Sequence, residues 1–287
     1  GEVEQIIETA ERLFGPYEWE RYDMLVLPPA FPYGGMENPR ITFLTPTLIA
    51  GDRSLVDVIA HELAHSWTGN LVTNATMDDF WLNEGFTVYA ERRILEEVYG
   101  VEFADLQGVV RRNALQVNLD QFGPDSPYTR LRNDLKGIDP DEVYSLVPYE
   151  KGAQFVLLLE DAVGRPRFDE FLLKYIKTFH FQSITTDEFL AFLEVGKQQL
   201  AGERRHSNSM TINFEHTTLF IDASAQFVAV VGADHVLDDV LEGVLRVDAH
   251  VVDQIRVDDP LRIRLVQPAQ LVLGHARRPA DLAASSV

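Results

Sequence analysis

The run His61-Glu62-Leu63-Ala64-His65 constrains the fold more than any other feature of this 287-residue chain. Apolar residues around it recur at helical spacing, so we expect a helix over residues 54–70. Ser54 is its expected N-cap, with Asp57 three residues further on. Residues four apart lie one above the other on a helix face. Two imidazoles in that arrangement can each give a nitrogen to the same metal ion.

Glu84 is a third candidate ligand. The chain between His65 and Glu84 is long enough to turn and begin an adjacent helix. We expect that helix over residues 83–99, with Gly100 as its end. A catalytic zinc needs three protein ligands and one open position. His61, His65 and Glu84 therefore predict a zinc site.

Glu62 points at a different angle from His61, so it can reach a water at the metal rather than the metal itself. The competing interpretation is that these are chance polar residues on amphipathic helices. It is disfavoured because His65 and Glu84 flank the strongly apolar Trp67 and Trp81, where an unpaired polar group would be costly to bury.

Other periodic patterns predict an α/β (α+β) fold that is mainly helical, with a small sheet lobe. Further helices are expected over residues 2–14, 101–119, 149–163, 166–180 and 186–200, the last capped by Thr185 or Thr186. Short strands are expected over 23–28 and 41–44, with a turn-rich loop or edge at 31–39.

Composition excludes several classes of protein. The net charge of −20 argues against nucleic-acid binding, which needs a basic surface. The chain has no cysteine, so disulfides and thiolate ligands are excluded, and a reducing, cytoplasmic location is expected. We expect no membrane partner, because no run approaches the roughly 20 apolar residues of a membrane span. The chain opens inside a predicted helix, and we expect it to be part of a longer protein.

Composition changes near residue 200. Residues 201–287 contain no Lys, Tyr or Trp, and short β-like runs recur there at 211–214, 226–231, 244–252 and 261–266. We therefore expect a catalytic domain over 1–200 and a separate segment over 201–287. The second segment is expected to be β-leaning or poorly ordered, and we assign it no function.

Four ordered motifs carry a resemblance to a known family. They are Tyr33-Gly-Gly-Met-Glu-Asn38, His61-Glu-Leu-Ala-His65-Ser-Trp-Thr-Gly-Asn70, Trp81-Leu-Asn-Glu-Gly85 and Tyr144-Ser-Leu-Val-Pro-Tyr-Glu-Lys-Gly152. Residues 1–195 resemble the zinc aminopeptidases that include leukotriene A4 hydrolase, aminopeptidase B and aminopeptidase N, and the leukotriene A4 hydrolase branch most closely. The resemblance implies a thermolysin-like catalytic domain that holds one Zn²⁺ between a sheet-bearing and a helical lobe. The family's N-terminal β domain and its C-terminal helical domain have no counterpart here.

The resemblance also implies roles for individual residues. His61, His65 and Glu84 match the zinc ligands, and Glu62 matches the general base. Tyr149 matches the tyrosine that stabilises the oxyanion. The substrate-binding residues implied are Gly34, Gly35, Met36, Glu37, Asn38, Asp141 and Tyr144. Glu37 matches the acid that binds the substrate's α-amine; Asp141 and Tyr144 match positions tied to epoxide handling, or are simple pocket wall.

The expected function is hydrolysis of the N-terminal bond of peptides with a free N-terminus. One alternative keeps the zinc but opens an epoxide on a fatty-acid-like substrate. Another is a zinc-binding fragment of poor activity, because the flanking domains are missing.

Overall fold

The computed structural model describes residues 1–49, 51, 54–123, 126–202, 212–213 and 218–219. The chain divides into two compact units, Gly1–Ser207 and Asn208–Val287. In the second unit the described residues are β6 (Ile212–Asn213) and β7 (Thr218–Leu219), which pair antiparallel. The strand expected at 211–214 thus coincides in part with β6, and those expected at 226–231, 244–252 and 261–266 lie outside the described residues. The boundary expected near residue 200 stays a prediction.

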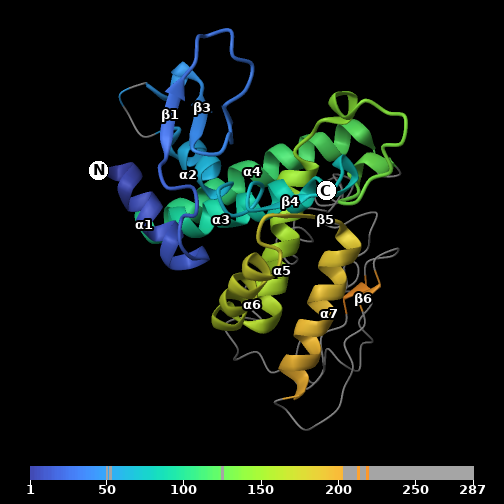
Figure 1. Ribbon diagram of the computed structural model, residues 1–287. Helices are drawn as coiled ribbons and strands as arrows, with labels where there is room; N and C mark the ends of the chain where they lie inside the picture. The colour runs from blue at the N-terminus through green and yellow to red at the C-terminus, as the bar shows by residue number, and fades with distance from the viewer. Residues whose placement is uncertain (50, 52–53, 124–125, 203–211, 214–217, 220–287) are drawn as a thin grey trace, which may run out of the picture. The chain divides into compact units, whose positions relative to one another are not determined.

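The first unit is mainly helical with two small sheets, which confirms the predicted fold class (Figure 1). Its helices are α1 (Glu2–Phe14), α2 (Val56–Ala64), α3 (Trp81–Tyr99), α4 (Val101–Phe122), α5 (Gly152–Val163), α6 (Arg165–Thr178) and α7 (Thr186–Gly202). Its strands are β1 (Asp23–Val26), β2 (Gly35–Met36), β3 (Ile41–Leu44), β4 (Val72–Asn74) and β5 (Gln182–Ile184). Short turns are η1 (Pro46–Leu48), η2 (Met77–Asp79), η3 (Pro127–Thr129), η4 (Pro140–Val143) and η5 (Val147–Lys151), the last a π-helical turn.

The α3 helix is the centre of this unit and packs against α1, α2, α4 and α5. Fourteen of its nineteen residues are buried, so neighbouring elements cover nearly every face of this helix. Trp81 and Phe86 form an aromatic core with Phe155 of α5, Tyr175 of α6 and Phe189 of α7. A helix held on all sides in this way is a rigid support for a site.

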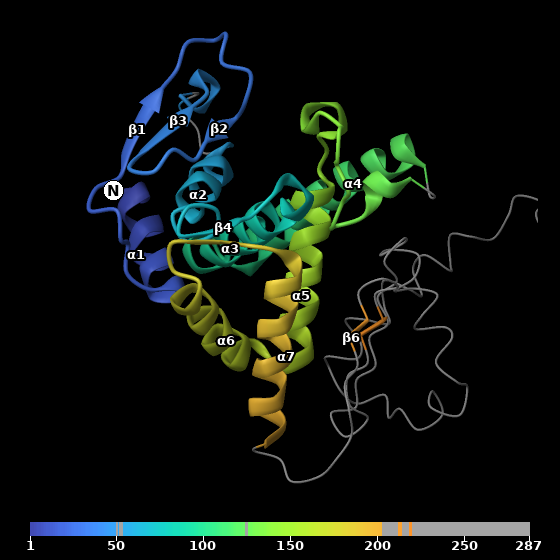
Figure 2. The same ribbon diagram turned by 45° about the vertical axis from the view of Figure 1, so that its right-hand side comes forward.

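Two small sheets connect the helices. In the first, β3 lies between β1, to which it is parallel, and β2, to which it is antiparallel. This sheet lies beside α2, on the other side of α3 from α5, α6 and α7 (Figures 1 and 2). In the second, β4 and β5 are parallel and join the chain after α2 to the chain before α7. The site helices α2 and α3 therefore lie between a sheet lobe and a helical lobe.

Two expectations about helix ends are wrong. The helix expected over 54–70 is shorter, because α2 ends at Ala64 with His65 as its C-cap, and its N-cap is Leu55 rather than Ser54. The helix expected from residue 149 begins instead with the π-helical turn η5, and regular α5 starts at Gly152. The cap expected at the start of α7 is confirmed at Thr185, whose Oγ1 accepts from Glu188 N at 3.2 Å.

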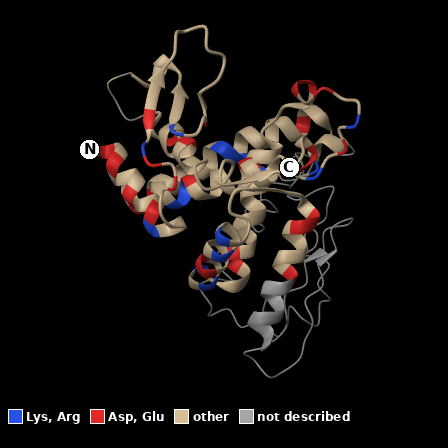
Figure 3. Ribbon diagram, viewed as in Figure 1, with Lys and Arg blue, Asp and Glu red and all other residues tan. Residues whose placement is uncertain are grey.

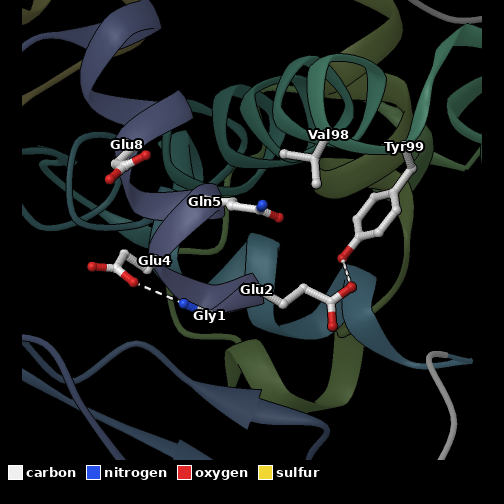
Figure 4. Close-up of a pocket in the computed structure, with 7 residues that line it drawn as sticks. All are labelled: Gly1, Glu2, Glu4, Gln5, Glu8, Val98 and Tyr99. Atoms are coloured by element: carbon white, nitrogen blue, oxygen red, sulfur yellow. Dashed lines mark hydrogen bonds and ion pairs between the residues drawn. The ribbon is translucent and has the colours of Figure 1, made fainter.

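Acidic side chains outnumber basic ones on α1, where Glu2 and Glu4 occupy the first turn (Figure 3). Beside them, a surface hollow of about 480 Å³ lies where α1 meets the end of α3 (Figure 4). It is lined by Gly1, Glu2, Glu4, Gln5, Glu8, Val98 and Tyr99. The predicted site residues are not among them. Within the described residues, no helix combines the length and apolarity that crossing a membrane requires.

Candidate active site

Two imidazoles face each other at the end of α2. His61 lies in the last turn of the helix, and His65 keeps helical backbone angles as its C-cap. Their Nε2 atoms are 3.1 Å apart. His65 is buried and His61 partly so, which places the pair at the inner wall of the site.

Glu84, in the first turn of α3, completes a triangle of ligand atoms. Its Oε2 lies 3.3 Å from Nε2 of His61 and 3.5 Å from Nε2 of His65. Glu84 is 4% exposed, and among the described residues its Oε2 makes no well-aligned hydrogen bond. A buried carboxylate oxygen left in this state requires a cation.

The triangle fits a zinc ion. Zinc sites are tetrahedral with bonds of roughly 2.0–2.1 Å to imidazole nitrogen, so neighbouring ligand atoms lie about 3.3–3.4 Å apart. The three edges formed by His61, His65 and Glu84, from 3.1 to 3.5 Å, bracket that value. Two nitrogens and one carboxylate oxygen are also donors that zinc accepts.

The pKa values of the three side chains in the metal-free protein also favour a cation at this position. Burial opposes the charge of His61, but Glu84 and Glu91 outweigh it and raise the pKa of His61 well above its usual range. Burial likewise opposes ionisation of Glu84, but His65 and His61 outweigh it and lower the pKa of that carboxyl. Burial lowers the pKa of His65. The cluster thus holds a positive charge against Glu84 even without a metal, and a divalent cation can take that place.

Glu62 lies next to the triangle but outside it. Its carboxylate packs against the backbone of Gly35, where an added Cβ would fall 2.3 Å from Glu62 Oε1. Its Oε2 is buried and has no hydrogen-bond partner in the described part of the chain. Burial raises the pKa of Glu62 to about 8 in the metal-free protein. A carboxylate this poorly solvated is a stronger base than an exposed one.

The Gly34–Asn38 segment brings a second carboxylate to the site. Gly35 and Met36 form β2, so Glu37 follows directly at the sheet edge beside α2. Ligand atoms of Glu37, Glu62 and His65 all lie within 4.8 Å of one another. Asn38 N donates to Met36 O at 3.0 Å in the turn that follows. The sequence-predicted segment and the ligand triangle are therefore adjacent in space.

Tyr149 reaches the site from the π-helical turn η5. Its ring stacks on that of His61, with centroids 6.2 Å apart and an interplanar angle of 22°. Burial, and next the nearby charge of Glu84, raise the pKa of Tyr149 above its usual range, so its hydroxyl stays protonated and can donate. The hydroxyl oxygen of Tyr144 lies 3.0 Å from that of Tyr149.

Asp141 is a predicted site residue that the structure leaves apart from the triangle. It is exposed on η4, where its backbone N–H donates to Asp139 Oδ1 at 3.1 Å. No hydrogen bond or ion pair between described residues links its carboxylate to the triangle. The structure thus brings together the predicted ligands, Glu62, Glu37, Tyr149 and Tyr144, but not Asp141.

Sequence reasoning missed the residues that support the site. Asn70 Nδ2 donates to the backbone oxygen of Glu37 at 2.7 Å and so ties the Gly34–Asn38 segment to the turn after α2. Glu91 lies against His61, and Thr68 against His65. One available signal was the spacing of Glu84 and Glu91: seven residues apart, they share a helix face.

Known proteins match the part of the chain that contains this candidate site. A family model described as "Peptidase family M1 domain" matches residues 1–210. "Leucine aminopeptidase 2" of Sclerotinia sclerotiorum is 54% identical over 192 residues, which are 67% of this chain and 32% of that protein. "Aminopeptidase B" of Homo sapiens is 52% identical over 194 residues, which are 67% of this chain and 30% of that protein. The chain thus spans about a third of the length of these relatives.

Solved structures agree with the fold. Leukotriene A4 hydrolase from yeast, in complex with bestatin, is 44% identical with a TM-score of 0.67 and matches 70% of this chain and 32% of its own. An M1 zinc metallopeptidase from Deinococcus radiodurans is 28% identical with a TM-score of 0.56 and matches 71% of this chain and 42% of its own. The four motifs all lie within residues 1–210, which the family model matches.

Proposed function

The chain belongs to peptidase family M1, and on that premise we propose that it is a zinc-dependent aminopeptidase that hydrolyses the N-terminal peptide bond of peptides. The observation that carries the proposal is the triangle of His61, His65 and Glu84 with the Glu62 carboxylate beside it. Relatives named as aminopeptidases support the same reaction. Since those relatives are about three times as long as the matched region, the activity of the whole protein is part of the proposal.

In this proposal the triangle holds one zinc ion through two Nε2 atoms and Glu84 Oε2. When bound, zinc lowers the pKa of water towards roughly 7 and polarises the scissile carbonyl. Glu62 accepts the proton of the attacking water and delivers it to the leaving amine. The buried, unpartnered Oε2 of Glu62 suits this exchange, because no protein donor competes for it among the described residues.

Two further residues position and stabilise the substrate. Glu37 binds the α-ammonium group of the substrate, which limits cleavage to the first peptide bond. The Tyr149 hydroxyl donates to the oxygen on which negative charge develops in the transition state. Its place next to Glu84 and over the ring of His61 supports this role, because the scissile carbonyl must come to the same point.

The proposal is tested with Glu62→Gln, which keeps the size of the side chain but removes the base. We expect the variant to bind zinc as the wild type does and to lose about 10²–10⁴-fold in hydrolysis of an aminoacyl-anilide. Glu97→Gln, an exposed change on α3, is the matched control and keeps full activity. Undiminished turnover by the Glu62 variant with zinc bound would refute the role.

The two alternatives are separated by related measurements. Product analysis with a fatty-acid epoxide tests whether the chain opens epoxides. The resemblance links Asp141 and Tyr144 to that reaction. Both residues are exposed, which gives the reaction no support. An assay of the purified chain with and without chelator tests whether it binds zinc without turnover. The cytoplasmic location stays a prediction.

A further inference from the structure

The two imidazoles of the triangle use their second nitrogens in different ways. Nδ1 of His61 lies 2.9 Å from Oε2 of Glu91, a side chain of α3. Nδ1 of His65 lies 3.0 Å from the backbone oxygen of Thr68, in the turn after α2. Both partners are acceptors, so in the zinc-bound form both Nδ1 atoms would carry the hydrogen and both Nε2 atoms would be free to bind the metal beside Glu84.

Only the hydrogen-bond partner of His61 is charged, because the carboxylate near His65 lies farther away, with Glu37 Oε1 4.0 Å from Nδ1. A carboxylate opposite Nδ1–H makes an imidazole a more basic ligand than a carbonyl does, and it fixes the orientation of the ring. His61 is partly exposed and packs against Tyr149, whereas His65 is enclosed. The less enclosed ligand therefore has the stronger second partner.

We propose that Glu91 is a positioning residue of the metal centre, which holds His61 in the tautomer and orientation that bind zinc through Nε2. The inference rests on the proposed zinc site and goes beyond its ligands and catalytic groups. Glu91 reaches His61 because it stands two helical turns after Glu84, so one face of α3 provides a ligand and the partner of another ligand.

The burial of Glu91 supports this role. It is 4% exposed, and a carboxylate in that position is costly unless it is paired. Arg111 of α4 is nearby: burial lowers its pKa, but Glu91 and Asp57 outweigh the burial and raise it. Arg111 itself donates to Asp57 Oδ2 at 3.0 Å, so among the described residues His61 is the hydrogen-bonded partner of Glu91.

A purely structural role for Glu91 makes a different prediction. A buried ion pair that only supports helix packing would change the unfolding of the metal-free chain and leave zinc release alone. A positioning role changes the rate at which zinc leaves and the ligand geometry around the metal. The two roles are separated by measuring metal binding directly.

The experiment compares the full-length wild type with Glu91→Gln, Glu91→Ala and the control Glu96→Gln. Glu96 lies on the same helix, and its ion pair with Arg165 at 2.6 Å is remote from His61. Zinc affinity is measured by competition with a chromogenic chelator, and release is followed after mixing with excess chelator. The cobalt(II) absorption spectrum reports ligand geometry, and thermal unfolding of the metal-free forms reports folding.

We expect Glu91→Ala to bind zinc about 10–100-fold more weakly and release it faster, with an altered cobalt spectrum. Glu91→Gln, which keeps the shape but loses the charge, is expected to fall between Glu91→Ala and the wild type. Glu96→Gln is expected to match the wild type. The inference would be overturned if the folded Glu91 variants kept the zinc affinity, zinc release rate and cobalt spectrum of the wild type. If only Glu91→Gln folds, a wild-type rate of zinc release from that variant would overturn it. A wild-type chain that binds no zinc would instead overturn the proposed function.

Discussion

The backbones of Gly85 and Gly152 touch where α3 crosses the start of α5. A Cβ added to Gly85 would lie 2.7 Å from Cα of Gly152, and one added to Gly152 would lie 2.8 Å from Cα of Gly85. The contact is between main chains, so no side-chain movement can relieve it. Glu84 precedes one glycine and Tyr149 lies three residues before the other. The paired glycines therefore set how closely the Glu84 carboxylate and the Tyr149 hydroxyl approach each other.

The first prediction concerns Gly152→Ala. The added methyl must push α3 and α5 apart, which we expect to cost about 1–3 kcal/mol of stability and to lower kcat through displacement of Tyr149. The control is Gly108→Ala on α4, where a Cβ meets open space and Ala is the better helix former by about 0.8–1.0 kcal/mol. Thermal unfolding and aminoacyl-anilide kinetics measure both. Equal unfolding temperatures for Gly152→Ala and the wild type would contradict the contact argument.

The elements that the sequence predicted well are those with a strong local signal. Helix α1 coincides with its expected range, 2–14, because its apolar spacing is regular and Gly15 ends it. The end of α2 could not be predicted in this way. After His65 the chain turns through Gly69, whose φ of 124° places the missing Cβ within 2.5 Å of His65 Nδ1. The turn at Gly69 depends on a contact with the buried imidazole of His65. A periodic sequence pattern carries no information about that contact.

Long-range pairings were the other omission. Strands β4 and β5 have three residues each and pair across more than a hundred positions, and three residues are too few to show alternation. The π-helical turn that carries Tyr149 also lacks a periodic signal, since its sequence continues into α5 without a break. The proposed ligands His61 and His65 could be named beforehand because their spacing follows from helix geometry. Their partners could not, because those contacts depend on how α2 and α3 pack.

A second prediction is that zinc stabilises the chain. A ligand that binds only the folded state stabilises it by about 2.7 kcal/mol at a free concentration one hundredfold above Kd. We expect thermal unfolding to shift upwards with zinc and to return after chelation. In Glu84→Gln, which removes the charged corner of the triangle, the zinc-dependent shift should largely disappear. A shift of wild-type size in that variant would show that the zinc binds elsewhere.

A third prediction concerns the contact that fastens α7 to the beginning of α3. Trp81 Nε1 donates to Thr186 Oγ1 at 3.0 Å, and Thr186 is completely buried. Thr186→Val keeps the shape but leaves the indole N–H without its acceptor, so we expect a loss of about 1–3 kcal/mol. Thr178→Val, at the exposed end of α6, should stay within about 0.5 kcal/mol of the wild type. Chemical denaturation measures both, and similar values for the two variants would contradict the prediction.

The last prediction separates the two tyrosines. Tyr149→Phe removes one hydroxyl from beside Glu84, and because that hydroxyl is proposed to act in the transition state, we expect kcat to fall about 10²–10³-fold with KM little changed. Zinc content should be unaffected. Tyr144→Phe removes the hydroxyl that lies 3.0 Å from that of Tyr149, on a residue that is 59% exposed, and we expect a much smaller loss. If both variants lost activity equally, the oxyanion would have to be stabilised by the pair acting together; if only Tyr144→Phe lost it, the assignment of Tyr149 would be wrong.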